Sequence, residues 1–208
     1  MNIAISIVVG YLLGCFQTSY IMSKLIMKKD IRELGTGNAG ASNATMEFGK
    51  LFGLVIAIAD VMKVVVSVFI IKLIFNNQIE GETLTMLIYI NALFVIIGHN
   101  YPFYMGFRGG KGTASLLGML FALDYRLGFI SLVIVVLVVY ISDYMVVGTV
   151  SLLVILMTYT VIFKLAPVNV FIVMIITGMS LYKHFGNIQR IRNGTEARVL
   201  GTIKKTVD

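Results

Sequence analysis

Residues 51–75 read LFGLVIAIADVMKVVVSVFIIKLIF, and this stretch decides the fold class. A helix needs roughly 20 apolar residues to cross the hydrocarbon core of a bilayer, and this run is long enough. An isolated strand would leave its backbone unpaired in lipid, so the run is predicted to be a transmembrane α-helix. The whole chain agrees, because 58% of its 208 residues are hydrophobic and only 13% are charged. A soluble domain of that size would need far more polar surface.

Working outward from this run, the rest of the chain divides into six further apolar runs. We therefore expect an all-α polytopic membrane protein with about seven transmembrane helices, in which residues 1–208 form one membrane domain. The further runs are Ile3–Leu25, Leu84–Gly98, Thr113–Leu123, Leu127–Ile141, Tyr144–Leu165 and Val168–Tyr182. The 113–123 run is too short to cross a bilayer alone. It is expected to be a half-span packed inside the bundle or a re-entrant segment.

The basic residues predict an orientation. The formal net charge is +7, and most of the 17 Lys and Arg residues fall in three polar segments, Lys24–Lys50, His99–Gly112 and Lys183–Asp208. Cytoplasmic loops of membrane proteins carry an excess of Lys and Arg. Seven crossings place all three segments on one side, with the N-terminus outside and the C-terminus in the cytoplasm. Because the charge lies in short loops between apolar runs, it favours orientation and phosphate binding over a nucleic-acid partner.

The first polar segment contains LGTGNAGASN at residues 34–43. Its G-x-G-x-x-G pattern would indicate a dinucleotide site only after a strand, and here a membrane helix precedes it. The glycines still allow a tight turn whose N–H groups can face an anion. The side-chain donors of the segment are Thr36, Asn38, Ser42 and Asn43. The alternative interpretation is a flexible polar linker between helices.

The second polar segment reads GHNYPF at 98–103 and GFRGGKGT at 106–113. It does not fit a nucleotide-binding P-loop, because Met105 and Gly112 stand where that motif needs Gly and Ser or Thr. A Gly-Gly-Lys-Gly sequence beside Arg108, at the start of an apolar run, nevertheless suits a phosphate cradle at a helix N-terminus. The alternative is a turn flanked by two basic anchors.

The third polar segment reads KHFGNIQRI at 183–191 and GTE at 194–196. On a helix, His184, Asn187 and Arg190 share one face and form a polar stripe. The chain has only two histidines, His99 and His184, and both lie in these polar segments. Histidine is the side chain best suited to move a proton near neutral pH.

Two charged residues lie in the middle of the 51–75 run, whereas Lys72 lies near its end. Asp60 and Lys63 are spaced i, i+3, so they can pair on one helix face. Charge within the membrane is costly, about 2.5–3.5 kcal/mol for each group on insertion scales. A structural ion pair facing the bundle is favoured over contact with a substrate.

Together, the three polar segments resemble the motifs of the bacterial acyl-phosphate:glycerol-3-phosphate acyltransferases, the PlsY family. The similarity runs from about residue 10 to residue 200 in the same order, and it includes Tyr11–Gly14 and the Asp60, Lys63 pair. The resemblance implies a seven-helix core in the bacterial inner membrane and three cytoplasmic motifs. It implies transfer of an acyl group from acyl phosphate to the sn-1 hydroxyl of glycerol 3-phosphate, which gives lysophosphatidic acid and phosphate. A separate soluble enzyme would supply the acyl phosphate, and no cofactor or metal is expected.

The resemblance and the residue chemistry together assign three groups of site residues. The catalytic residues are expected to be His184, Asn187, Thr36 and Lys111. The substrate phosphate is expected to bind Gly37, Asn38, Gly40, Ser42, Asn43, Arg108, Gly109, Gly110, Gly112 and Arg190. The structural residues are expected to be Asp60, Lys63, His99 and Glu196. Acyl phosphate is already an activated mixed anhydride, so direct attack by the acceptor hydroxyl is favoured over a covalent acyl-enzyme.

Some positions depart from the family pattern and leave an alternative open. Met46 stands where the family usually has Arg, and Arg32 or Lys50 could replace that charge. Val146 stands where a Ser is expected, with Thr149 as the nearest hydroxyl. The alternative function is a catalytically degenerate paralogue that binds acyl phosphate or phospholipid and regulates the pathway. A small anion transporter also fits the apolar runs, but the chain lacks the inverted repeat of many carriers.

Overall fold

A computed structural model of the chain describes residues 1–75, 78–79 and 81–201. Throughout this part of the chain the regular secondary structure is helical, as the apolar runs predict. The helices are α1 (Asn2–Gly14), α2 (Thr18–Ile26), α3 (Ala41–Phe48), α4 (Lys50–Phe75), α5 (Gly81–Asn100), α6 (Thr113–Leu123), α7 (Tyr125–Ser142), α8 (Met145–Ile162) and α9 (Pro167–Arg192), with short 3₁₀ turns at Ile31–Glu33 and Phe103–Met105.

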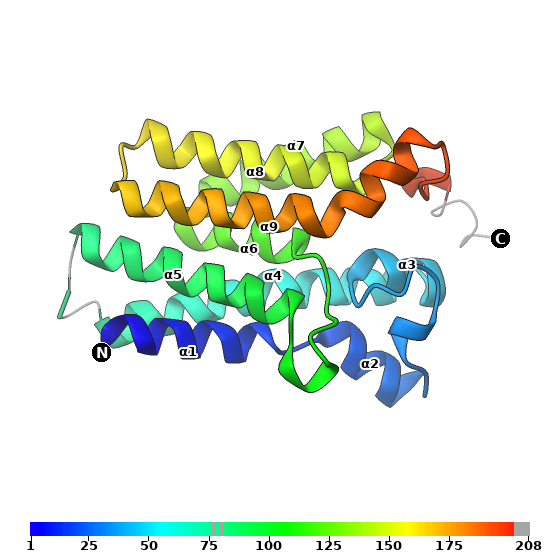
Figure 1. The fold of residues 1–208 in the computed structure, drawn as a ribbon, viewed down its shortest axis with the longest axis horizontal. Coiled ribbons are helices and arrows are strands. Elements are labelled where there is room, and N and C mark those ends of the chain that lie inside the picture. Colours follow the sequence, from blue (N-terminus) through cyan, green and yellow to red (C-terminus); the bar gives the residue numbers. More distant parts are fainter. Residues whose placement is uncertain (76–77, 80, 202–208) are drawn as a thin grey trace.

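The long helices lie side by side and alternate in direction (Figure 1). The start of α1 lies at one end of the bundle, and the end of α9 lies at the other. The α2–α3 region, the loop between α5 and α6, and the end of α9 all gather at this second end. The fold therefore brings the three polar segments together, although they are far apart in the sequence.

Six segments of the described chain are long and apolar enough to cross a membrane, counting Asn2–Ile26 as one. The short α6 is a further apolar helix of 11 residues, with the same bounds as the run predicted from sequence. The expectation of seven crossings, with the N-terminus outside and the C-terminus in the cytoplasm, stays a prediction.

The composition of the first apolar run suggested one continuous helix, but the structure divides this run into two helices. It breaks at Cys15–Gln17 into α1 and α2. Gln17 is fully buried, and its side chain donates a hydrogen bond of 2.7 Å to the carbonyl of His99 on α5. The Phe16 carbonyl, freed by the break, accepts from Lys63 Nζ at 3.2 Å. A break at membrane depth is tolerated because neighbouring helices satisfy its backbone groups.

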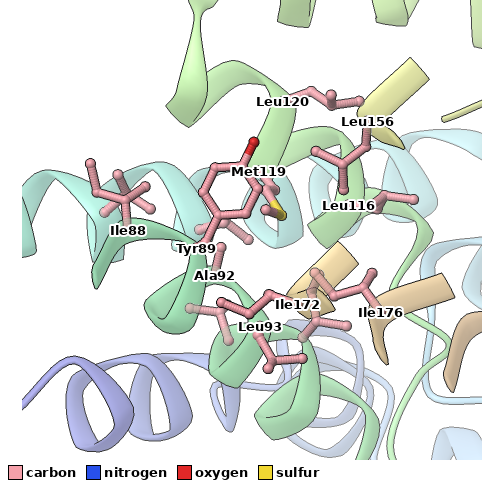
Figure 2. Packing of buried hydrophobic residues seen from close by; sticks show 14 of the residues in the cluster. Ile88, Tyr89, Ala92, Leu93, Leu116, Met119, Leu120, Leu156, Ile172 and Ile176 are labelled. Atoms are coloured by element: carbon pink, nitrogen blue, oxygen red, sulfur yellow. The ribbon is translucent and has the colours of Figure 1, made fainter. Parts of the chain in front are cut away.

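The helix α6 forms the centre of the core, which explains how so short a segment fits within a membrane bundle. Met119 and Leu120 are completely buried, and they pack among α5, α8 and α9 (Figure 2). Tyr89 of α5 reaches the same region, where its hydroxyl lies 3.0 Å from Thr160 Oγ1. A Cβ on Gly118 would lie 2.5 Å from the Val61 carbonyl of α4, so the two backbones touch. This fits the half-span interpretation better than a re-entrant loop.

Glycines allow α1 to pack directly on α5. A Cβ on Gly10 would lie 2.4 Å from the Asn91 carbonyl, and one on Gly14 would lie 2.2 Å from the Val95 carbonyl. Small residues at helix crossings are a common means of close packing in membranes. This contact fixes the end of α5, from which the second polar segment begins.

Candidate active site

A chain of polar contacts joins the second and third polar segments. Lys111, in the glycine-rich loop before α6, donates a short hydrogen bond to Asn187 Oδ1 on α9. The Asn187 amide nitrogen donates in turn to Glu196 Oε1. The other oxygen of Glu196 accepts from Arg190 Nε at 2.7 Å. One carboxylate thus orients the amide that holds the lysine, and the structure brings together four residues predicted for the site.

His184 lies one helical turn before Asn187 and is 4% exposed. Its Nδ1 lies 2.9 Å from the carbonyl oxygen of Ser180. A carbonyl only accepts hydrogen bonds, so Nδ1 carries the proton and the neutral ring presents an unprotonated Nε2. The charged groups that face this ring are Lys111, Lys183 and Glu196. This tautomer is the one that a proton acceptor needs.

The glycine-rich loop is built against His99. Gly109 N–H donates to the Asn100 carbonyl at 3.1 Å, and Gly110 N–H donates to the His99 carbonyl at 3.0 Å. A Cβ on Gly109 would lie 2.1 Å from the His99 carbonyl, and one on Gly110 would lie 2.1 Å from His99 Nε2. The contact with backbone leaves no room for a side chain at Gly109. Gly112 adopts a φ of +84°, which favours glycine and turns the chain into α6.

Gly109 and Gly110, two of the five glycines assigned to phosphate binding by sequence, therefore also have a packing role. Their N–H groups already donate to carbonyls at the end of α5, so they are not free to bind a ligand in this arrangement.

The His99 ring belongs to a buried charged cluster. Lys63 Nζ lies 2.8 Å from Asp60 Oδ1 and 2.7 Å from His99 Nδ1. All three side chains are at most 7% exposed. The ion pair predicted from the i, i+3 spacing therefore forms, and it supports the ring on which the glycine loop is folded.

Asn43 holds the first polar segment together. Its Oδ1 accepts from the Thr36 N–H at 2.9 Å and from Thr36 Oγ1 at 3.1 Å. Its Nδ2 donates to the carbonyls of Ile31 and Leu34 at 3.1 and 3.0 Å. Every hydrogen-bonding position of the amide is occupied, so Asn43 is placed to shape the loop and not to contact a phosphate. Its partner Thr36 is exposed at the loop surface.

Arg32 connects the first segment to the second. Its guanidinium binds both carboxylate oxygens of Asp30 and donates to the Met105 carbonyl at 2.8 Å. The hydrogen bonds from Arg32 lower the pKa of Asp30 to about 2, although burial opposes this shift. The structure thus uses Arg32 as a tether between loops, so it is not free to replace the family Arg at Met46.

The structure does not bring every predicted phosphate contact to the Lys111 region. Arg108 and Ser42 are exposed, and no side-chain contact joins either of them to Lys111 within the described residues. Gly37 is exposed with a φ of +70°, and Gly40 precedes α3, where Asn38 Nδ2 lies 2.8 Å from the position of a Cβ on Gly40. Thr36, Gly37, Asn38 and Gly40 belong to the α2–α3 region, at the same end of the bundle as the Lys111 loop.

Sequence reasoning missed three polar residues of this region. Gln17 donates to the His99 carbonyl, as described above, and its place inside an apolar run was a signal for it. Asn100 is fully buried, and neither polar atom of its amide has a partner among the described residues. Its Oδ1 lies 3.2 Å from the position of a Cβ on Gly112, so the amide faces the glycine loop. Lys183 donates to the Asn100 carbonyl at 3.2 Å.

A hydroxyl also lies where the family pattern suggested one was missing. Thr149 on α8 is buried, and its Oγ1 lies 2.8 Å from Thr113 Oγ1, the first residue of α6. The helix after Val146 therefore contributes a hydroxyl next to the end of the glycine-rich loop. This weakens one of the two observations that favoured a degenerate paralogue.

Burial and the neighbouring cations Arg190 and Lys183 lower the pKa of Lys111, while Glu196 opposes the shift. A cation held at some cost gains the most from a bound anion, so the site suits a phosphate. No group of three or more His, Cys, Asp or Glu side chains suited to a metal occurs in the described part of the chain.

Comparison with known proteins finds relatives that match nearly the whole chain. A family model described as glycerol-3-phosphate acyltransferase matches residues 4–194. Glycerol-3-phosphate acyltransferase 1 of Oceanobacillus iheyensis is 40% identical over 201 residues, which is 96% of each chain. The glycerol-3-phosphate acyltransferase of Clostridioides difficile is 35% identical over 192 residues, which is 92% of this chain and 93% of the relative.

Solved structures give the same result. The crystal structure of PlsY, an integral membrane glycerol 3-phosphate acyltransferase, in its glycerol 3-phosphate form has a TM-score of 0.83 at 25% identity, covering 95% of this chain and 96% of that one. Its lysophosphatidic acid form has a TM-score of 0.80 and shares the fold.

Proposed function

Since this chain belongs to the glycerol-3-phosphate acyltransferase family, we propose that its acyl donor is acyl phosphate and that lysophosphatidic acid and inorganic phosphate are its products. The protein is an acyltransferase of phospholipid synthesis that resides in a membrane. The observation that carries the proposal is the hydrogen bond between Lys111 and Asn187, because it joins the glycine-rich loop to the polar stripe of α9.

In the proposed site, Lys111 binds the phosphate of glycerol 3-phosphate as an ammonium, with Arg190 adding positive charge. The N-terminus of α6 adds a partial positive charge beside them. Asn187 and Glu196 hold the lysine in place. The loop containing Thr36, Gly37, Asn38 and Gly40 provides the opposite wall, while Asn43, Gly109, Gly110 and Gly112 shape the two loops.

The proposed chemistry is a direct transfer. The sn-1 hydroxyl oxygen forms a bond to the acyl carbon, and the bond between that carbon and the phosphate oxygen breaks. The hydroxyl proton moves to His184 Nε2 or to an oxygen of the leaving phosphate. Neighbouring cations and backbone dipoles stabilise the negative charge that develops on the carbonyl oxygen. The acyl chain stays among the helices, in the plane of the lipid.

We also propose the bacterial inner membrane as the location, with the polar end of the bundle in the cytoplasm. Glycerol 3-phosphate and a soluble enzyme that supplies acyl phosphate would then reach the same face. The positive-inside distribution of Lys and Arg supports this orientation.

Acyl transfer by the purified, detergent-solubilised protein tests the function. Radiolabelled glycerol 3-phosphate and synthetic palmitoyl phosphate would be supplied to wild type, Lys111→Ala and the matched control Lys29→Gln, an exposed cation near the same end. We expect labelled lysophosphatidic acid from wild type and Lys29→Gln, and a loss of at least about a hundredfold in Lys111→Ala. Substrate binding without product in wild type would support the degenerate paralogue instead.

A second assay tests the direct transfer. His184→Ala should lose turnover while keeping its affinity for glycerol 3-phosphate, and full turnover would remove His184 from the mechanism. An acylated side chain trapped on the protein by mass spectrometry would contradict direct attack.

A further inference from the structure

A cavity lies at the end of the bundle opposite the candidate active site. It has a volume of about 280 Å³ and lies between the start of α5 and the turn from α8 to α9. In Figure 1 both segments are at the same end as the start of α1. Asn169 lines the cavity, and Asn187 lies 18 residues further along α9, which corresponds to about 27 Å of helix. A ligand in this cavity therefore cannot touch the residues proposed for catalysis.

Asn169 is the main reason to regard the cavity as a binding site. Its side chain is only 1% exposed, yet neither its Nδ2 nor its Oδ1 has a hydrogen-bond partner among the described residues. Buried amides are almost always paired, so each unpaired one needs an explanation. A ligand that both accepts and donates hydrogen bonds would satisfy the two atoms.

The charges around the cavity indicate the character of this ligand. Lys164 and Glu82 both line it, and neither forms an ion pair within the described part of the chain. The N-termini of α5 and α9 also meet there, and helix N-termini favour anions. A lysine, an amide and two helix starts suit a phosphate, whereas Glu82 suits a cation. The cavity therefore matches a ligand that carries both charges.

An apolar groove continues from the polar cavity. It also has a volume of about 280 Å³, it lies between α7 and α8, and it shares Phe163 with the cavity. Val154, Ile162 and Phe163 are each more than half exposed on this surface, as expected for side chains that face lipid. Tyr159 also lines the groove, and its ring is tilted against that of Phe163 with the ring centroids 4.6 Å apart. Tyrosine is typical of the boundary between lipid and water.

We propose that this cavity and groove bind one phospholipid whose headgroup carries a phosphodiester and a primary ammonium. The phosphodiester is held by Lys164 and the Asn169 amide nitrogen. The ammonium is held by Glu82 and the Asn169 amide oxygen. One acyl chain lies along the groove between α7 and α8. This proposal does not depend on the acyl-transfer activity.

The test is a lipid titration of the full-length, delipidated protein in detergent, followed by native mass spectrometry. Dioleoyl phosphatidylethanolamine is the probe. Phosphatidylglycerol lacks the ammonium, phosphatidylcholine lacks its N–H donors, and soluble phosphoethanolamine lacks the chains. The variants are Asn169→Leu, Lys164→Gln and Glu82→Gln, and Lys29→Gln at the other end of the bundle is the matched control.

We expect one phosphatidylethanolamine per wild-type chain, bound about tenfold more tightly than phosphatidylglycerol or phosphatidylcholine. Asn169→Leu and Lys164→Gln should each weaken this binding about tenfold, and Glu82→Gln should abolish the preference over phosphatidylglycerol. Lys29→Gln should bind as wild type does. Thermal unfolding gives an independent measure, because phosphatidylethanolamine should raise the Tm of wild type but not that of Asn169→Leu.

Equal affinity of all five proteins for phosphatidylethanolamine would overturn the proposal. Equal affinity of wild type for the three phospholipids would do the same. Phosphoethanolamine bound as tightly as the whole lipid would overturn the role of the groove. Lys164 and Glu82 are exposed, so their variants keep the test valid even if Asn169→Leu does not fold.

Discussion

The pKa of the Lys111 ammonium is shifted in opposite directions by its surroundings. Burial and the cations Arg190 and Lys183 lower its pKa, whereas Glu196 raises it. The ammonium form binds phosphate, so binding should be present below the lowered pKa and should be lost as the pH rises through it. The phosphate monoester has a second pKa of about 6 and is almost fully ionised above about pH 8, so it does not contribute to the change.

We therefore expect the KM of wild type for glycerol 3-phosphate to rise over a pH range below the ordinary lysine pKa of 10.5, before a lysine in water would lose its proton. In Lys111→Arg the KM should stay flat across this range, because a guanidinium remains charged. Initial rates against substrate concentration at each pH provide the measurement. The same rise in both proteins would show that another group titrates.

Glu196 acts through its neighbours, since it accepts from Asn187 and Arg190. Glu196→Gln removes the negative charge, and the new side-chain amide can rotate by 180° and present its nitrogen to Asn187. Asn187 would then no longer hold Lys111 in one orientation. We expect kcat to fall about tenfold, with a smaller effect on the KM for glycerol 3-phosphate. Arg192→Gln, an exposed charge at the end of the same helix, is the control and should retain wild-type kinetics. A loss confined to protein yield would make Glu196 a folding residue only.

Residue identities could be predicted from the sequence better than residue contacts. The pairing of Asp60 with Lys63 followed from helix periodicity, and the common face of His184, Asn187 and Arg190 follows from the same geometry. The complete hydrogen bonding of the Asn43 amide could not be predicted from the sequence, because it depends on carbonyls that only the folded loop brings near. Polar side chains at a glycine-rich turn look alike in sequence, whether they bind a ligand or the loop itself.

At the scale of elements, the apolar runs gave most helices to within a few residues, and they failed where tertiary contacts decide. The first run divides because Gln17 and Lys63 replace helical hydrogen bonds with contacts from other helices. The last run extends to Arg192, ten residues beyond its apolar part. That extension carries the polar stripe, which contacts the Lys111 loop through Asn187.

The connection between the first and second segments predicts an acid sensitivity. The pKa of Asp30 is lowered to about 2 by Arg32, from an ordinary value of 3.8. A lowered carboxyl pKa gives stability that is fully present above about pH 4 and is lost as the pH falls toward 2. We expect the Tm of wild type in detergent to fall more over this range than that of Asp30→Asn.

At neutral pH, Asp30→Asn should cost about 1–2 kcal/mol, at the lower end because Arg32 is partly exposed to solvent. Glu33→Gln, an exposed carboxylate nearby, is the matched control and should retain the wild-type pH profile. An identical acid profile in Asp30→Asn and wild type would mean that Arg32 does not stabilise the fold through this carboxylate.

At the scale of the whole molecule, the alternation of helix direction brings three remote segments to one end. The number and order of apolar runs predicted this meeting. Two runs separate the first polar segment from the second and four separate the second from the third, and an even number of crossings returns the chain to the same side. The cavity near Asn169 could not be predicted in this way. It depends on how the turn from α8 to α9 meets the start of α5, and neither segment has a distinctive motif.

Cys15 gives the whole chain a useful property for labelling. It is the only cysteine of the sequence, and it is 4% exposed. The wild-type protein is therefore expected to react very slowly with thiol reagents. A cysteine introduced at its surface would be the only readily labelled thiol. A membrane-impermeant maleimide applied to intact cells should modify Thr83→Cys, at the start of α5, and should spare Lys28→Cys until the membrane is opened. The reverse pattern would show that the molecule has the opposite orientation in the bilayer. Glycerol 3-phosphate would then have to reach the enzyme from outside the cell.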